Sequence, residues 1–277
     1  MVPPHSSLRL SKPNGISARC PSSIKFMKIP PVSIIIPTLN EEGYLPLLLE
    51  SLKKVATPLD IIVVDGNSTD NTHTVVESFE SDFSGDSSLR LIFLKERCIS
   101  LQRNIGAQQA KYDLLIFCDA DILMPSADVY EQMISEFIEK KYVVAAPVMI
   151  PIEDLRDVQR IFKFLMFVQK ALLILKRPYF AGSYLLTTKD VFTKLGGFDT
   201  KIRLGEDVDY SLRASKLGSY GFRSTPILVS ARILIKYGYG WIFRETPNMF
   251  RLLFTGHVHA EKMFYPFGDF GKPYSSK

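Results

Sequence analysis

The segment LLIFCDADILMP, residues 114–125, decides the fold of this chain. Its apolar run ends in two carboxylates, Asp119 and Asp121, which only Ala120 separates. Such a run is typical of a buried parallel strand. Paired carboxylates repel one another and lose hydration on burial, so stability alone does not explain them at a strand end. The pair predicts a positive partner, and a divalent cation that carries the phosphates of a ligand is the natural candidate.

Further apolar runs alternate with helical patterns along the first half of the chain. We expect strands at VSIIIP (32–37), DIIVVD (60–65), LRLIFLK (89–95) and VVAAPVM (143–149). We expect helices around 45–52, 100–111, 130–138, 154–175 and 206–217, the last capped by Gly218. Strands and helices that alternate at this spacing form βαβ units, so the sequence predicts an α/β fold with a mostly parallel sheet.

Polar clusters follow three of the expected strands. They are Pro37-Thr38-Leu39-Asn40-Glu41, Asp65-Gly66-Asn67-Ser68 and Asp119-Ala120-Asp121. Ligands on parallel sheets bind beyond the carboxyl ends of the strands, so three clusters at one edge indicate a binding site. Helix caps and solvated loop acids are the competing interpretation for each cluster taken alone.

Three other groups are candidates for chemistry. Glu206 and Asp207 open an expected helix; the helix dipole accounts for one acid and leaves the other for general-base work. Arg103 could neutralise phosphate oxygens, although an ordinary solvated helix charge is the simpler interpretation of its position. His257 and His259 would share one side of an extended segment and could contact a metal, but isolated histidines near a tail are more often surface residues.

Composition narrows the class of protein. The chain has 277 residues, 46% of them hydrophobic, and a net charge of +5, which is enough for a sizeable core. Twelve Lys or Arg face six Asp or Glu from residue 201 onward, a bias that suits anionic ligands or an anionic membrane surface. No nucleic-acid motif accompanies this bias, so we expect no nucleic-acid partner. Three scattered cysteines without metal or disulfide spacing favour a reducing cytoplasm.

Two segments are ambiguous. Residues 1–29 are basic, rich in Ser and Pro, and predict a disordered leader; an organellar transit peptide or a start at Met27 are the alternatives. Residues 154–175 are strongly apolar but are interrupted by Lys163 and Lys170, which argues against a membrane-spanning helix. A core helix is the simpler interpretation, and an interfacial helix that docks on a membrane is the alternative.

Four motifs in chain order resemble those of family 2 glycosyltransferases. They are SIIIPTLNEE (33–42), IIVVDGNSTDNT (61–72), QRNIGAQQAKYDLLIFCDAD (102–121) and LGEDVDYSLRASKLG (204–218). The ordered set is more specific than any single motif. The resemblance implies the GT-A fold, with a Rossmann-like twisted sheet and a helical or irregular C-terminal acceptor region. It implies a nucleotide-binding half (30–125), an acceptor half (126–230) and a C-terminal extension (231–277) packed on that domain.

The resemblance also implies roles for individual residues. Asp207, next to Glu206, would be the catalytic base, and Asp121, with Asp119, would bind Mg²⁺ or Mn²⁺. Gly182 and Ser183 would lie at the acceptor. The nucleotide-binding residues would be Pro37, Thr38, Asn40, Glu41, Asp65, Gly66, Arg103, Asp119 and Ala120.

The expected activity is metal-dependent, hexosyltransferase-like transfer of a sugar from a nucleotide-diphosphate sugar to an acceptor hydroxyl, with inversion. No Q-x-x-R-W follows residue 230, so we expect a non-processive enzyme. The acceptor would be a lipid, a glycan or a small molecule, and the enzyme would be cytoplasmic with peripheral membrane contact. A non-catalytic nucleotide-sugar-binding protein on the same scaffold is the alternative. A sugar-nucleotide pyrophosphorylase is a third interpretation, but Thr38–Glu41 replaces its Gly-rich loop.

Overall fold

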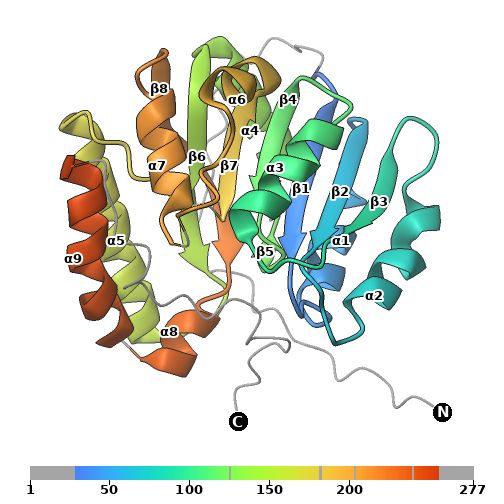
Figure 1. Cartoon of the computed structure of the whole chain (residues 1–277), viewed down its shortest axis with the longest axis horizontal. Helices are drawn as coiled ribbons and strands as arrows, with labels where there is room; N and C mark the ends of the chain where they lie inside the picture. Colours follow the sequence, from blue (N-terminus) through green and yellow to red (C-terminus); the bar gives the residue numbers. More distant parts are fainter. Residues whose placement is uncertain (1–28, 125, 181–182, 203, 239, 256–277) are drawn as a thin grey trace.

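One twisted eight-stranded sheet forms the centre of the molecule in the computed structural model, which describes residues 29–124, 126–180, 183–202, 204–238 and 240–255 (Figure 1). The strand order is β3-β2-β1-β4-β7-β6-β8-β5. The strands are β1 (Val32–Thr38), β2 (Leu59–Asp65), β3 (Ser88–Phe93), β4 (Leu114–Cys118), β5 (Ile122–Leu123), β6 (Tyr142–Pro151), β7 (Tyr184–Thr188) and β8 (Ser219–Val229).

The direction of the strands divides the sheet. β1 lies between β2 and β4 and is parallel to both, and β3 extends this parallel part beyond β2. β7 is antiparallel to β4 and to β6, while β6 and β8 are parallel to one another. The α/β fold with a mostly parallel sheet is therefore confirmed.

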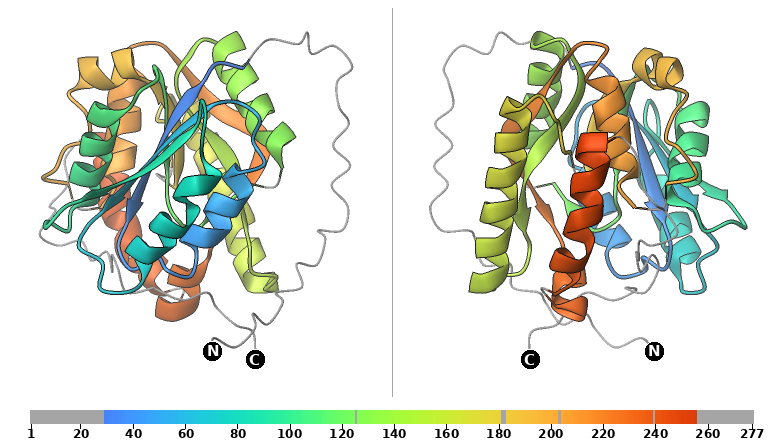
Figure 2. Two further views of the ribbon diagram at one scale, coloured as in Figure 1. Left: turned by 90° about the vertical axis from the view of Figure 1, so that its right-hand side faces the viewer. Right: turned by 60° about the vertical axis from the view of Figure 1, so that its left-hand side comes forward.

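Helices cover both faces of the sheet (Figure 2). They are α1 (Leu45–Leu52), α2 (Thr72–Phe79), α3 (Ile99–Gln109), α4 (Ala127–Glu139), α5 (Arg156–Ile174), α6 (Lys189–Leu195), α7 (Glu206–Ala214), α8 (Arg232–Tyr237) and α9 (Gly240–Thr255), with a short 3₁₀ turn, η1 (Glu80–Asp82). Side chains alternate along β1, so Ile34 and Ile36 belong to the apolar core with α1, α2 and α4, whereas Ile35 belongs to the core with α3, α6 and α7.

The second half departs from the sequence-based expectations. The helix expected over 206–217 ends at Ala214, and the N–H groups of Lys216 and Leu217 donate to carbonyls three residues back, which tightens the last turn. Gly218 is not a cap. A Cβ at Gly218 would lie 2.7 Å from Val143, so this glycine permits close contact between the turn and β6. β8 and α9 were not expected from periodicity, whereas the helix expected over 154–175 is α5.

Helix α3 packs unusually close to the sheet. A Cβ at Gly106 would lie 2.4 Å from Ile35 Cγ2, so only glycine allows the helix this near to β1. Gln102 Nε2 donates hydrogen bonds to the carbonyls of Thr38 (2.8 Å) and Val64 (2.7 Å), near the ends of β1 and β2. The next residue on α3, Arg103, is therefore fixed at the carboxyl edge of the parallel strands.

A buried carboxylate, Asp60, secures the opposite edge of the parallel strands. It accepts hydrogen bonds from Ser33 Oγ (2.7 Å), the Lys111 N–H (2.7 Å) and the guanidinium of Arg90. Burial acts to raise the pKa of Asp60, but the hydrogen bonds from Arg90, Lys111 and Ser33 outweigh it and lower the pKa below its ordinary value. The ionised carboxylate therefore stabilises the folded chain.

We expect Asp60→Asn to lower the free energy of unfolding by about 3 kcal/mol at neutral pH, because one acceptor oxygen becomes an NH2 donor that faces other donors and Arg90 loses its charged partner. Since the pKa of Asp60 is depressed on folding, its contribution is present above the unfolded-state pKa and disappears as the pH falls through the folded-state pKa. Urea denaturation between pH 3 and pH 7 measures both effects. The exposed Asp113, at the start of β4, provides a control: Asp113→Asn should change stability by less than about 0.5 kcal/mol. Equal losses for the two variants would contradict this role of Asp60.

Candidate active site

Three consecutive residues of α3 join the strand ends to the loop before α7. Gln102 holds β1 and β2, as described above, and Asn104 exchanges two hydrogen bonds of 2.8 Å with the backbone of Phe198. Arg103 lies between them and faces the site, with its guanidinium 5.4 Å from the centre of the Phe198 ring. The local sequence Gln-Arg-Asn thus brings the start of α7 to the carboxyl edge of the sheet.

Arg103 is the bridge between two of the expected motifs. Its side chain is 2% exposed and donates to Glu206 Oε1 (2.5 Å) and Asp119 Oδ1 (2.9 Å). Burial would lower the pKa of Arg103, but Asp119, Glu206 and Asp207 raise it above its ordinary value, so the guanidinium stays charged. The interpretation of Arg103 as a solvated helix charge is wrong. The D-x-D pair and the Glu206-Asp207 pair, far apart in sequence, belong to one charged cluster.

A second arginine, Arg232 at the start of α8, holds the other end of this cluster. It donates to both carboxylate oxygens of Glu41, at 2.6 and 2.8 Å. Its Nε lies 3.0 Å from Asp121 Oδ2, so the ion pair joins the β1–α1 loop to the D-x-D pair. The guanidinium also lies 4.8 Å from the centre of the Tyr44 ring.

No pattern in the sequence predicts Arg232 as a site residue, because no recognisable motif surrounds it. Its place depends on the missed strand β8, whose following residue Ser230 donates its N–H to the carbonyl of Asp121 (3.1 Å). Glu153 then accepts the N–H of Ala231 (2.8 Å) and fixes the turn from β8 into α8. These long-range contacts, rather than local periodicity, bring Arg232 to the site.

Among the described residues, the cluster contains more carboxylates than guanidinium groups. Its five acids are Glu41, Asp119, Asp121, Glu206 and Asp207, and its two bases are Arg103 and Arg232.

The surplus of acids is visible in the pKa values. Burial raises the pKa of Glu41 to about 7 and that of Asp121 to about 6, although Arg232 opposes both shifts. Burial, reinforced by the charge of Asp207, raises the pKa of Glu206 to about 7 against the effect of Arg103. A further cation would therefore be favoured here.

A separate hydrogen-bonded group joins the first two polar clusters. Asp65 is fully buried and accepts from Thr38 Oγ1 (3.0 Å), the Ser68 N–H (2.8 Å) and His73 Nε2 (2.9 Å). Burial acts to raise the pKa of Asp65, but hydrogen bonds from Ser68, His73 and Thr38 lower it below its ordinary value. Asn40 Oδ1 accepts the N–H of Thr69 (2.8 Å). His73 was not foreseen from the sequence.

The remaining residues expected at the nucleotide lie along the same carboxyl edge of the sheet. Pro37 pairs with Val64 in the sheet, and the Gly66 N–H donates to the carbonyl of Thr38 (2.9 Å). Ala120 is buried between the two aspartates of the D-x-D pair. The structure thus brings the three polar clusters to one edge, where Asp65 and Asn40 tie the first two loops together.

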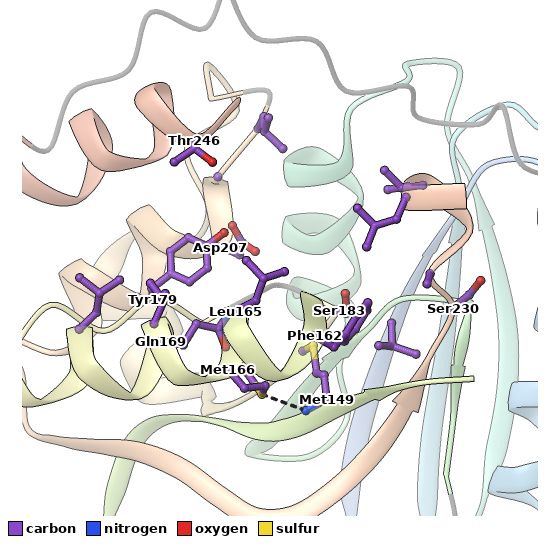
Figure 3. Close-up of a pocket in the computed structure, with 18 of the residues that line it drawn as sticks. Met149, Phe162, Leu165, Met166, Gln169, Tyr179, Ser183, Asp207, Ser230 and Thr246 are labelled. Atoms are coloured by element: carbon purple, nitrogen blue, oxygen red, sulfur yellow. Dashed lines mark hydrogen bonds between the residues drawn. The ribbon is translucent and has the colours of Figure 1, made fainter. Parts of the chain in front are cut away.

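Asp207 lies in the first turn of α7, at the wall of a cavity of about 320 Å³ (Figure 3). Gly205 precedes the helix with φ +85°, a left-handed conformation that glycine tolerates, and so lets the chain turn into α7. Ser183, the expected acceptor residue, lines the same cavity, and its carbonyl accepts the N–H of Asp119 (2.9 Å). The cavity wall therefore adjoins the D-x-D pair. Gly182, His257 and His259 lie outside the described residues.

One known protein family matches the part of the chain that contains the first three of the four motifs. The family model described as "Glycosyl transferase family 2" matches residues 33–196. A 4,4'-diaponeurosporenoate glycosyltransferase of Staphylococcus haemolyticus is 30% identical over 40% of this chain and 29% of its own length. An undecaprenyl-phosphate 4-deoxy-4-formamido-L-arabinose transferase of Proteus mirabilis is 32% identical over 38% of this chain and 33% of its own length. The matched segment is thus about a third of each curated relative.

A solved structure supports the expected fold over a longer stretch. The mannosyltransferase PcManGT from Pyrobaculum calidifontis, in complex with GDP-Man and Mn²⁺, superposes with a TM-score of 0.62. The superposition covers 78% of this chain and 60% of that one, at 21% sequence identity. At this identity the likeness concerns the fold alone, and it confirms the GT-A architecture.

Proposed function

This chain belongs to glycosyl transferase family 2, and from that membership we propose that it transfers a sugar from a nucleotide-diphosphate sugar to an acceptor hydroxyl, with inversion. One observation carries the proposal. Arg103 joins Asp119 of the D-x-D pair to Glu206, so that Asp207, the next residue, lies at the wall of a cavity beside the expected donor site. The expected leaving-group site and the proposed general base would therefore be adjacent.

The donor would bind along the carboxyl edge of β1, β2 and β4. Glu41 and Asp65 would contact base or ribose together with the backbone around Pro37–Asn40, Gly66 and Ala120. Arg103 would stabilise negative charge on the leaving diphosphate, because a buried guanidinium acts more strongly there than in water. The Proteus mirabilis relative is named for transfer of 4-deoxy-4-formamido-L-arabinose and PcManGT was solved with GDP-Man, so these similar proteins leave the sugar of this chain open.

Asp119 and Asp121 are the residues that would hold Mg²⁺ or Mn²⁺. The surplus of carboxylates and the raised pKa of Asp121 fit a cation at this place. Within the described residues no group of three or more His, Cys, Asp or Glu side chains could hold a metal ion. Such a cation commonly uses one or two carboxylates and completes its shell with substrate phosphates and water. When bound, it would neutralise charge on the diphosphate.

Asp207 would act as the base of a single displacement. It removes the proton of the acceptor hydroxyl while that oxygen bonds to the anomeric carbon from the side opposite the diphosphate. The bond between the anomeric carbon and the diphosphate oxygen breaks, and its electron pair leaves with the nucleoside diphosphate. Asp207 then gives the proton to solvent, and the transferred sugar has the inverted configuration.

We propose peripheral contact with the cytoplasmic face of a membrane, and helix α5 supports the membrane contact. One side of α5 lines the cavity, yet the side chains of Phe164 (64%), Phe167 (69%) and Ile174 (82%) are largely exposed elsewhere on it. A helix that is apolar on both sides needs a second apolar neighbour. Exposed bases accompany these side chains: Lys163, Lys170, Lys176 and Arg177. None of the helices in the described residues is long and apolar enough to cross a membrane.

We expect the protein to float with phosphatidylglycerol vesicles, and the double variant Phe164→Glu/Phe167→Glu to lose at least about tenfold in partitioning, because two apolar side chains no longer enter the interface. High salt should also weaken binding, since each base near an anionic surface contributes about 1 kcal/mol. Leu217→Glu, at an exposed position after α7, is the matched control and should float like the wild type. Failure of the wild type to float would contradict membrane contact.

Turnover tests the proposed function as a whole. The chain is incubated with UDP-glucose, UDP-N-acetylglucosamine and GDP-mannose in Mn²⁺ or in EDTA, and release of the nucleoside diphosphate is measured. We expect release from at least one donor, and only with the metal. Tight donor binding without release would instead indicate the non-catalytic binding protein.

A further inference from the structure

The cavity beside Asp207 has a mostly apolar wall. Helix α5 contributes Phe162, Leu165 and Leu172 to it, and α9 contributes Leu253. The volume of about 320 Å³ is about ten times the share of one molecule in liquid water, so it has room for a group of about ten non-hydrogen atoms. Cavities of this size with an apolar wall are typical of small-molecule sites.

One polar side chain in this wall has an unmet hydrogen bond. Gln169 of α5 is 6% exposed, lines the cavity, and its Oε1 has no hydrogen-bond partner among the described residues. Buried amide oxygens are almost always paired, because an unmet hydrogen bond costs about 1–3 kcal/mol. Figure 3 shows Gln169 and Tyr179 on the same side of the cavity as Asp207. The oxygen itself has almost no exposed surface, so a ligand that donates a hydrogen bond would meet it after the Gln169 amide rotates toward the cavity.

The cavity adjoins the expected donor site. Ser183 and Ser230 both line it. The carbonyl of Ser183 accepts the N–H of Asp119, and the N–H of Ser230 donates to the carbonyl of Asp121. A ligand in the cavity would thus lie against Ser183 and Ser230, whose backbones hydrogen-bond to the D-x-D pair, and beside Asp207.

We propose that this cavity holds the apolar body of the acceptor, and that the acceptor is an alcohol whose hydroxyl lies between Gln169 and Asp207. The inference deepens the proposed function and rests on it. The hydroxyl donates to Gln169 Oε1 during binding and loses its proton to Asp207 during transfer. A polar glycan fits this wall poorly, because its other hydroxyls would be buried without partners. Gln169 is then the residue that selects an alcohol over a hydrocarbon.

A pair of ligands that differ by one hydroxyl tests this selection without turnover. Binding of 2-naphthalenemethanol and of 2-methylnaphthalene is followed by naphthalene fluorescence. We expect the wild type to prefer the alcohol by about tenfold or more, because the hydrocarbon leaves Gln169 unpaired. Failure to bind the alcohol, or an equal affinity for both ligands, would overturn the proposal.

Three variants of α5 test whether Gln169 is the residue that selects the alcohol. Gln169→Leu should abolish the preference for the alcohol and leave the melting temperature unchanged or higher, because a buried unpaired oxygen is removed. Leu165→Trp should fill the cavity and prevent binding of both ligands, with a melting curve to establish that it folds. Gln159→Leu is the same change at a position outside the cavity wall, where Gln159 pairs with Asp154, and should keep the preference. A preference that survives Gln169→Leu contradicts the assignment.

Transfer assays then distinguish the source of the alcohol. The acceptors are free 2-naphthalenemethanol, a diacylglycerol in phosphatidylcholine vesicles, and maltose. Glycosylation of 2-naphthalenemethanol supports the inference for a free acceptor, and glycosylation of the diacylglycerol supports it for a membrane-borne acceptor. In either case Gln169→Leu should reduce the rate about tenfold, and Gln159→Leu should leave it unchanged. Glycosylation of maltose alone, at a rate that Leu165→Trp leaves intact, overturns the inference but not the proposed function. Selective alcohol binding without any sugar transfer counts against the proposed function instead.

Discussion

Replacing Asp207 with asparagine is expected to slow sugar transfer by about 10²–10⁴-fold, the usual contribution of a general base. The amide preserves the shape of the side chain but cannot accept the proton of the acceptor. Binding of UDP or GDP should change by less than about twofold, because Arg103, Asp119 and Asp121, rather than Asp207, would contact the diphosphate. Initial rates and calorimetric titration measure the two effects separately.

Asp209 offers a control in the same helical turn. It pairs with Arg213 (2.7 Å) and does not line the cavity. Asp209→Asn removes an equivalent charge from the N-terminus of α7, so it reproduces any effect on the helix dipole. We expect it to transfer sugar at close to the wild-type rate. Equal loss of transfer in both variants, or loss of nucleotide binding in Asp207→Asn, would contradict the role of Asp207 as the base.

Replacing Asp121 with alanine should remove the part of nucleotide binding that depends on metal. We expect affinity for GDP or UDP in Mn²⁺ to fall by about 100-fold or more, since even residues behind a metal ligand contribute 10–100-fold. The fold should survive, because Arg232 keeps its two hydrogen bonds to Glu41 and no unpaired guanidinium is created. Titrations with Mn²⁺ and with EDTA separate the two components of binding.

An exposed acid near the D-x-D pair provides a control for the loss of one negative charge. Asp128 is exposed in the first turn of α4, shortly after the D-x-D pair. Asp128→Ala should bind the nucleotide with wild-type affinity in Mn²⁺. If Asp121→Ala binds equally well in Mn²⁺, the metal role of Asp121 is wrong.

The parallel part of the sheet could be predicted because the residue patterns of its strands and helices are local. Buried parallel strands such as 59–65 are continuous apolar runs, and the helices between them have apolar residues at helical spacing. Their polar ends then meet at one edge, which is why Asp65, Asp119 and Glu41 were found from sequence. Local pattern therefore predicted that these polar side chains meet at one edge of the sheet.

The rest of the site depends on contacts between distant segments. β8 has eleven residues, yet Gly221 and Pro226 interrupt its apolar pattern, and its place is set by pairing with β6 and β5. Arg232 follows from that pairing, so no local pattern predicts it. Local pattern misjudged Arg103 as well, because its position in the expected helix resembled that of a solvated charge. Only the fold, through Gln102 and Gly106, shows that it is buried between two acids.

The cavity was the least predictable feature. Apolar residues of α5 were visible in sequence, but Gln169 had no distinguishing pattern among them. Its importance rests on the missing partner of one buried oxygen, which depends on how α5, α7 and α9 pack together. Tertiary packing therefore decides the proposed acceptor side, whereas sequence motifs indicate the proposed donor side.

The configuration of the sugar first released from an α-linked nucleotide sugar tests single displacement at Asp207 most directly. With water as the acceptor, proton NMR during the first turnovers distinguishes the two anomers before they equilibrate. We expect the β anomer first, in Mn²⁺ and not in EDTA, and almost none with Asp207→Asn. Release of the α anomer first, or undiminished release by Asp207→Asn, would contradict displacement by an oxygen that Asp207 activates.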